Sequence, residues 1–221
     1  MRKTWAKAAN LLRLGTLIVG TLFASSMHAQ LYVANYLNST VGEYDPNSGA
    51  AINATLVSGA ISPIELAISG NNLYVANDGS DSIGLYNLTT GAAINPSFVT
   101  GINPLGGMVV SGSTLYAASG SPATSGAVST WNANTGAAIS ASFLTIAPQG
   151  GSQSRIESLA ISGNNLYVSY SSLAGSGVGE FNATTGAAIN ASLIPMTVPA
   201  GMSISGNDLY AINQGDEEID E

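Results

Sequence analysis

A short segment recurs along this chain, and its spacing limits the possible folds more than any other feature. The copies are Leu31–Asn35 (LYVAN), Leu73–Asn77 (LYVAN), Leu115–Ala118 (LYAA), Leu166–Ser169 (LYVS) and Leu209–Asn213 (LYAIN). Their first leucines are 42, 42, 51 and 43 residues apart. A period near 42 residues, made of short apolar runs and turn residues, indicates a stack of like units that bury their apolar faces against one another.

One repeat, residues 62–104, carries the signals of four strands. The expected strands are Glu65–Ser69, Leu73–Asn77, Ser82–Tyr86 and Ala92–Val99. Gly, Asn, Asp and Thr are frequent in the short segments between them, as expected for an all-β fold. Four strands in about 42 residues make one blade of a β-propeller. We therefore predict a β-propeller in which about four to five blades are present.

The repeats predict blades of unequal completeness. Residues 31–61 form a partial blade, residues 62–104, 105–155 and 156–198 form full blades, and residues 199–221 form a second partial blade. Ile219 follows Leu209 by the same ten residues as Ile83 follows Leu73, so the last segment continues the repeat into a third strand. This pattern favours a fragment or a truncated propeller, and the alternative is an acidic tail that protects an edge strand by charge. We expect the exposed blade edges of an open ring to cause self-association.

Two positions recur with the strands and predict how the blades pack. Aromatic residues end the third strand of each blade: Tyr44, Tyr86, Trp131 and Phe181. We expect them between adjacent blades, because apolar residues at repeating strand positions usually face a core. A glycine precedes Ala-Ala-Ile in each of four turns: Gly49, Gly91, Gly136 and Gly186. A recurrent glycine at a turn predicts a positive φ.

Residues 1–29 have the pattern of a secretory signal peptide. Four basic residues are followed by an uncharged run, Leu14–Ala24, and then by small and polar residues as far as Ala29. The run is too short to span a membrane, which takes about 20 residues. The alternative is a buried N-terminal helix. Cleavage after Ala29 predicts a secreted protein, extracellular or periplasmic, that consists of residues 30–221.

The composition of residues 30–221 narrows the function classes. This part of the chain has one basic residue, Arg155, against all 13 acidic residues, which gives a formal net charge of −12. Such a charge disfavours binding to nucleic acid or to anionic lipid. It has no Lys, His or Cys, so a His general base, a Cys or Lys nucleophile and the usual transition-metal ligands are missing, which leaves paired carboxylates or a metal held by carboxylates and amides. No segment is apolar enough for a membrane span.

The predicted loops differ between the two faces of the propeller. The turns on one face hardly change between repeats, whereas insertions at residues 119–125, 147–155 and 171–177 fall on the other face. Variable loops on one face of a repeat scaffold usually mark its binding face. The candidate binding residues on this face are Asn35, Glu65, Asn77, Asp78, Asp81, Arg155 and Glu157.

These residues could instead have only structural roles. In that case Arg155 and Glu157 form a solvated ion pair, and the asparagines cap their own turns. The carboxylates of Asp78, Asp81 and 216–218 offer a weak Ca²⁺ site, because calcium takes oxygen ligands. No other cofactor is expected.

The Leu-Tyr-Val-Ala-Asn strand, the Ser-Ile-Gly-Leu-Tyr strand and the Thr-Thr-Gly turn resemble the NHL/YVTN group of β-propellers over residues 31–219. They are most similar to secreted bacterial repeat proteins, with the SMP-30-like superfamily at a distance. The resemblance is specific for the fold, and the variable loops and scarce catalytic residues favour a binding or surface-interaction scaffold for a protein, glycan or small molecule. Some relatives are lactonases, with a carboxylate and amide metal site in the channel, or lyases that use His. Our prediction is a non-enzymatic scaffold, with a metal-dependent lactonase-like or lyase-like enzyme as the alternative.

Overall fold

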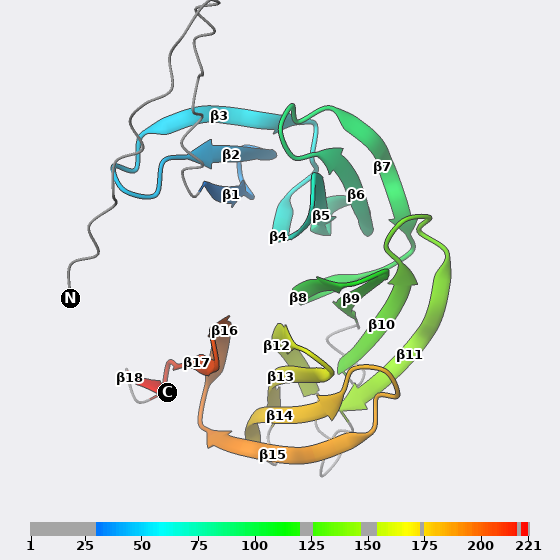
Figure 1. The fold of residues 1–221 in the computed structure, drawn as a ribbon, viewed down its shortest axis with the longest axis vertical. Helices are drawn as coiled ribbons and strands as arrows, with labels where there is room; N and C mark the ends of the chain where they lie inside the picture. The colour runs from blue at the N-terminus through cyan, green and yellow to red at the C-terminus, as the bar shows by residue number, and fades with distance from the viewer. Residues whose placement is uncertain (1–29, 120–125, 147–153, 173–174, 216–217, 221) are drawn as a thin grey trace, which may run out of the picture.

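The computed structural model describes residues 30–119, 126–146, 154–172, 175–215 and 218–220 (Figure 1). In these ranges 18 strands form five antiparallel sheets. The first sheet holds β1 (Leu31–Asn35), β2 (Thr40–Tyr44) and β3 (Ala51–Ser58). The second holds β4 (Pro63–Ser69), β5 (Asn72–Asn77), β6 (Ser82–Asn87) and β7 (Ala93–Thr100), with the 3₁₀-helix η1 (Asp78–Ser80) between β5 and β6. All four strands predicted in this repeat are confirmed, within two residues at each end.

The other three sheets repeat the pattern. The third holds β8 (Pro104–Ser111), β9 (Thr114–Ser119), β10 (Gly126–Asn132) and β11 (Ala138–Ile146). The fourth holds β12 (Ser154–Ser162), β13 (Asn165–Ser172), β14 (Ser176–Asn182) and β15 (Ala188–Met196). The fifth holds β16 (Pro199–Ser205), β17 (Asp208–Asn213) and β18 (Glu218–Asp220), so the predicted third strand of the last repeat is present.

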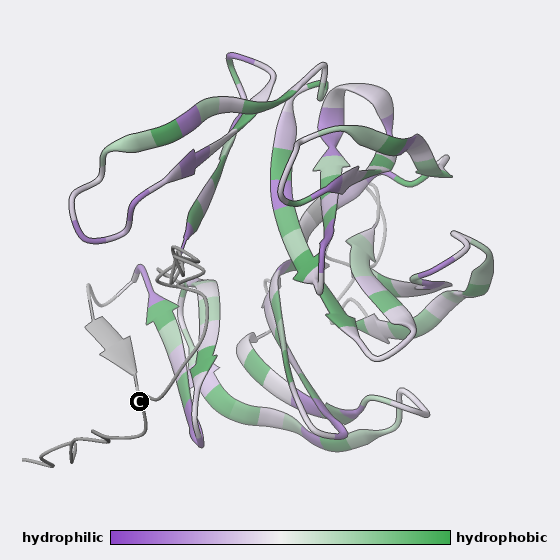
Figure 2. Cartoon of the chain, turned by 45° about the horizontal axis from the view of Figure 1, so that its top comes forward, coloured by the Kyte–Doolittle hydropathy of each residue, from purple (hydrophilic) through white to green (hydrophobic). Residues whose placement is uncertain are grey.

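The five sheets stand as blades around a common axis, with β4, β8, β12 and β16 innermost and β3, β7, β11 and β15 at the rim (Figure 1). The arc is open between the first and fifth sheets. Apolar residues lie along the strands, and hydrophilic residues gather mainly in the turns (Figure 2). No helix in the described ranges is long and apolar enough to cross a membrane.

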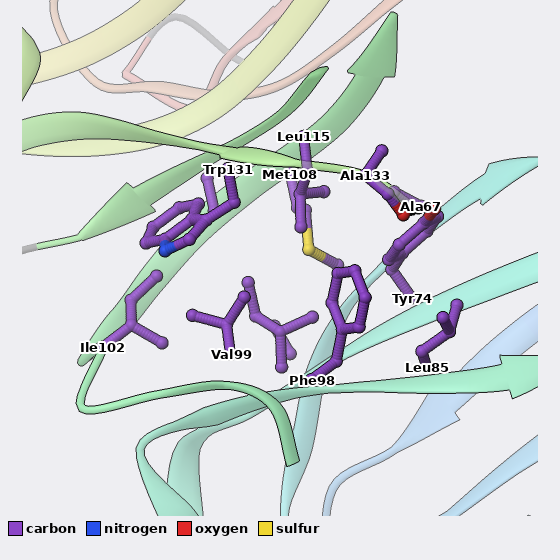
Figure 3. Close-up of a cluster of buried hydrophobic side chains, with 13 residues drawn as sticks. Ala67, Tyr74, Leu85, Phe98, Val99, Ile102, Met108, Leu115, Trp131 and Ala133 are labelled. Atoms are coloured by element: carbon purple, nitrogen blue, oxygen red, sulfur yellow. Dashed lines mark hydrogen bonds between the residues drawn. The ribbon is translucent and has the colours of Figure 1, made fainter. Parts of the chain in front are cut away.

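Neighbouring blades are held together by clusters of buried apolar side chains. The cluster between the second and third blades places Trp131 beside Ile102 and Phe98 beside Tyr74 (Figure 3). The recurrent aromatics Tyr86, Trp131 and Phe181 are all buried in such clusters, which confirms their predicted place between blades. Tyr44, in the first blade, is only half-buried.

The recurrent turn glycines let each blade approach its predecessor closely. All four have φ between +68° and +73°, as predicted. A Cβ at Gly91 would collide with the carbonyl oxygen of Leu56 on β3. The same collision would occur between Gly136 and Phe98 and between Gly186 and Phe143. Glycine therefore serves two needs here, a left-handed backbone and a close contact with the preceding rim strand.

Candidate functional site

Hydrogen bonds join neighbouring loops on one face of the propeller in the second and fifth blades. The backbone N–H groups of Asp78 and Gly79 donate to the carbonyl oxygens of Ser62 and Ile61, each at 3.1 Å. In the fifth blade, the Gln214 N–H donates to the carbonyl oxygen of Val198 at 2.9 Å. Loops between the second and third strands therefore lie against loops that join the blades. We call this surface the variable-loop face, and its insertions at 120–125, 147–153 and 173–174 lie outside the described residues.

The two strand-end asparagines Asn77 and Asn213 support these loops. Oδ1 of Asn77 accepts the Ile61 N–H at 3.1 Å, and Nδ2 donates to the Val75 carbonyl oxygen at 3.3 Å. Oδ1 of Asn213 accepts the Val198 N–H at 3.1 Å in the same way. Both asparagines are buried, so their amides hold the loop that leads into the innermost strand of their own blade. Asn35 differs, because its Nδ2 donates instead to Thr40 Oγ1 at 3.4 Å.

Glu65 lies on the innermost strand β4 and contacts the innermost strand β8 of the next blade. Burial raises the pKa of its carboxyl, and the backbone N–H groups of Leu66 and Gly107 lower that pKa in part. Gly107 belongs to β8 of the next blade. Two blades on, the hydroxyl of Ser158 accepts the Met202 N–H of the following blade at 3.2 Å. At two blade junctions, therefore, a side-chain oxygen on one innermost strand accepts a hydrogen bond from a backbone N–H of the next innermost strand.

Arg155 and Glu157 form an ion pair at the start of β12. Arg155 Nε lies 3.3 Å from Glu157 Oε2, and Glu157 Oε1 accepts a 2.6 Å hydrogen bond from the Ser171 hydroxyl. The side chain of Arg155 is 61% exposed, whereas that of Glu157 is 21% exposed. The carboxylate is therefore fixed by β13 while much of the arginine side chain reaches solvent. An exposed pair of this kind contributes about 0–1 kcal/mol to stability.

Asp78 lies in a patch that the sequence analysis did not identify. Its Oδ2 accepts a hydrogen bond from the Tyr36 hydroxyl at 3.3 Å, across the junction of the first two blades. Tyr36 is 48% exposed, Leu37, the next residue in the chain, is 91% exposed, and Ile61, which packs on η1, is 51% exposed. We call Tyr36, Leu37, Ile61 and Asp78 the loop patch. Asp81 lies three residues farther along the chain and is exposed, and its carbonyl oxygen accepts the Ile102 N–H at 3.2 Å.

Backbone contacts hold the loop patch in one arrangement. The Ser62 N–H donates to Ser39 Oγ at 3.4 Å, which ties the β1–β2 loop to the loop between blades. A Cβ on Gly79 would lie 2.9 Å from Cγ2 of Ile61, so Ile61 packs directly on η1. The sequence signal for the patch is a departure from the repeat. Tyr-Leu-Asn follows Asn35, where Asp-Gly-Ser follows Asn77.

The predicted candidates are therefore distributed among three places. Asp78 joins the loop patch between the first two blades, Arg155 and Glu157 lie together on the fourth blade, and Glu65 faces the next innermost strand. In the part of the chain that the structure describes, no three His, Cys, Asp or Glu residues gather where they could hold a metal ion. Asp216 and Glu217 of the suggested calcium site lie outside the described residues.

The axis of the propeller contains a hollow of about 300 Å³, lined mainly by residues with aliphatic side chains. It is lined by four innermost strands through Ala67, Ile68, Met108, Val109, Val110, Leu159, Ala160, Ile161, Met202, Ser203 and Ile204. No carboxylate or amide side chain is among these residues. The lining side chains therefore offer no carboxylate or imidazole that could act as an acid, a base or a metal ligand.

Comparison with known proteins identifies the fold. No family model and no curated protein matches the chain. A solved nidogen/laminin complex superposes with a TM-score of 0.68 at 12% identity, over 87% of this chain and 71% of that chain. Hydrazine synthase of Kuenenia stuttgartiensis gives 0.58 at 14% identity, over 82% of this chain and 52% of that one. A mitotic checkpoint complex gives 0.56 at 15% identity, over 83% and 53%.

These solved structures are β-propellers, so the predicted multi-blade β-propeller is confirmed. The chain spans about half the length of the last two. At 12–15% identity the likeness concerns the fold alone. The resemblance to the NHL/YVTN group stays a prediction.

Proposed function

We propose that this protein is a secreted, non-enzymatic β-propeller that binds a partner protein through its variable-loop face. The observation that carries the proposal is the loop patch, in which three large apolar side chains are exposed next to one carboxylate. Exposed apolar groups that lie together mark interaction sites more often than single exposed residues do. The unequal loops predicted on this face support the same function.

The loop patch has the features of an interface centre. Tyrosine is enriched among the residues that dominate binding energy, and a partner that covers the exposed aliphatic neighbours would exclude water around it. The hydrogen bond from Tyr36 to Asp78 restricts the ring before any partner arrives. Restriction in the unbound state reduces the entropy lost on binding. The patch is therefore organised in advance and does not depend on a loop becoming ordered.

The charge of the chain indicates the kind of partner. Residues 30–221 carry a formal net charge of −12, and Asp78 belongs to the patch, with Asp81 three residues farther along the chain. Charges at the rim of an interface mainly determine association rate and specificity. The partner that fits is a protein with an apolar surface surrounded by Lys and Arg. A nucleic acid does not fit this charge.

The solved structures and the N-terminal sequence support the proposal at a general level. Two of the similar structures are protein complexes, a nidogen/laminin complex and a mitotic checkpoint complex. Secretion is inferred from residues 1–29, and mass spectrometry of protein from the culture medium checks it. A chain that begins at Gln30 is expected, and a chain that retains residues 1–29 would contradict secretion by this route.

Affinity capture from the medium of the producing culture tests the binding function. The bait is the wild-type protein, a Leu37→Ser/Ile61→Ser variant, or a control Ile94→Ser/Ile139→Ser variant. The control changes two exposed isoleucines on the rim strands β7 and β11. Ile94 is 55% exposed and Ile139 is 58% exposed. We expect a protein captured by the wild type and the control to be lost with the loop-patch variant. Equal capture by all three baits would refute the assignment of this face.

A further inference from the structure

Basic residues are confined to two places in this chain. Four of the five Lys and Arg residues lie within residues 2–13, and the fifth is Arg155. Proteases of trypsin-like specificity hold a Lys or Arg side chain in a pocket that contains a carboxylate, and they cut the peptide bond that follows it. The bond between Arg155 and Ile156 is therefore the one bond between residues 14 and 221 that such a protease recognises.

The arginine is accessible, but the residues on both sides of it are not. The side chain of Arg155 is 61% exposed, whereas Ser154 is 3% exposed and Ile156 is 0% exposed. All three lie on β12 and pair with β13, with Ser154 opposite Ser172 and Ile156 opposite Tyr170. Proteases cut preferentially at exposed loop tips, where the chain can enter the enzyme's cleft as an extended segment. The bond after Arg155 lies in a paired strand instead.

The third blade covers the start of β12. Ser154 Oγ donates to the Ile146 carbonyl oxygen at 2.6 Å and accepts the Gly126 N–H at 3.1 Å. Ile156 belongs to the buried cluster between the third and fourth blades, and a Cβ on Gly126 would lie 3.1 Å from its Cγ1. The start of β12 can therefore leave β13 only if it also leaves β10 and β11 of the third blade.

The side chain of Arg155 is also held along its strand. Its Nε lies 3.3 Å from Oε2 of Glu157, and the Ser171 hydroxyl on β13 donates a 2.6 Å hydrogen bond to Oε1 of the same carboxylate. The carboxylate in the pocket of a trypsin-like protease has to replace Glu157 as the partner of the guanidinium. An exposed ion pair of this kind is weak, so it protects the bond less than the buried residues on either side do.

We propose that the bond between Arg155 and Ile156 is a latent cleavage site, which the packing of the third blade on the fourth protects from trypsin-like proteases. Opening of this junction releases the start of β12 as an extended segment. Water then adds across the peptide bond and leaves a carboxylate on Arg155 and an amine on Ile156. The inference goes beyond the proposed function, because it concerns the survival of the folded chain among proteases and does not involve the loop patch.

Digestion of the full chain with trypsin tests the proposal. Cleavage after Arg155 is followed by intact mass, which separates it from cuts within residues 1–13. A synthetic peptide of residues 151–160, GSQSRIESLA, is digested in the same buffer as the fully open reference. We expect the chain to be cut after Arg155 at least about 100-fold more slowly than the peptide, because cleavage depends on the fraction of molecules that is open. Equal rates would overturn the proposal.

Two serine variants show where the chain opens. Ser154→Ala removes both hydrogen bonds of Ser154 Oγ to the third blade and should speed cleavage about tenfold. Ser129→Ala is the matched control, since the Ser129 hydroxyl is also buried and donates to the Ala141 carbonyl oxygen at 2.6 Å within the third blade. We expect this control to be cut at close to the wild-type rate. Equal acceleration in the two variants, or none in Ser154→Ala, would overturn the proposed protection, and the comparison of the wild type with the peptide does not depend on either variant.

Discussion

The hydroxyl of Tyr74 donates a 2.7 Å hydrogen bond to the carbonyl oxygen of Ala133, 59 residues farther along the chain and in the next blade. Tyr116 makes the same 2.7 Å bond to Ala183 one blade later. Each tyrosine ring also meets a phenylalanine edge-on, Phe98 and Phe143 respectively. A buried carbonyl at the turn of one blade is thus satisfied by a strand tyrosine of the blade before it.

Tyr74→Phe is expected to lower the free energy of unfolding by about 1–2 kcal/mol, because it leaves the Ala133 carbonyl oxygen without this donor. Tyr32→Phe is the matched control, since the Tyr32 hydroxyl donates to the Gln30 side chain in an exposed position. Urea denaturation followed by circular dichroism measures both. Equal stability losses in the two variants would show that the bond between blades contributes nothing specific.

Gly91→Ala is expected to destabilise the protein more than Gly49→Ala. Both glycines have φ near +70°, so alanine costs about 1 kcal/mol of backbone strain at either position. A Cβ at Gly91 also meets the Leu56 carbonyl oxygen, while a Cβ at Gly49 meets nothing within 4 Å. Overpacking of this kind adds about 1–3 kcal/mol. Thermal unfolding of the two variants gives the difference, and equal melting temperatures would contradict the close packing of the turn on the preceding blade.

Asn77→Ala is expected to lower stability by about 1–3 kcal/mol, because the Ile61 N–H loses its acceptor. Asn35→Ala should cost less than about 1 kcal/mol, since Asn35 makes one 3.4 Å bond to a side chain. Chemical denaturation compares the two. A neutral Asn77→Ala variant would return this residue to the set of candidate binding residues.

Glu65 predicts a dependence of stability on pH. Burial raises the pKa of this carboxyl in the folded state above the ordinary value of 4.5, so folding favours the protonated form. Its contribution is therefore most favourable below pH 4.5 and is lost as the pH rises through the folded-state pKa. The stability of the wild type relative to Glu65→Gln should fall over that interval and then level off. Denaturation curves at several pH values measure it, and a difference that does not change with pH would contradict burial of the carboxyl.

The repeat made the fold predictable from sequence, because each blade has the same strand and turn pattern and any one copy can be checked against the others. The place of Tyr86, Trp131 and Phe181 between blades could be predicted because they recur at the same position of the repeat. The hydrogen bonds of Asn77 were not predictable in detail. They join a strand end to a loop residue 16 positions earlier, which the antiparallel pairing of β4 with β5 brings beside Asn77.

The loop patch was missed because its residues have no motif. Tyr36 and Ile61 are far apart in the sequence and belong to different loops, and ordinary apolar residues are expected in a core. In the structure both side chains are about half exposed. The ion pair of Arg155 and Glu157, in contrast, could be predicted from opposite charges two residues apart on one strand.

The central claim is that the loop patch binds a partner protein, and the affinity of the captured partner tests it most directly. Isothermal titration calorimetry with the purified partner compares the wild type, Leu37→Ser and the rim control Ile94→Ser. Leu37 is 91% exposed, so its replacement should leave stability nearly unchanged while weakening binding about tenfold or more. Ile94→Ser should bind like the wild type. Unchanged affinity in Leu37→Ser, with the partner still bound, would contradict the claim.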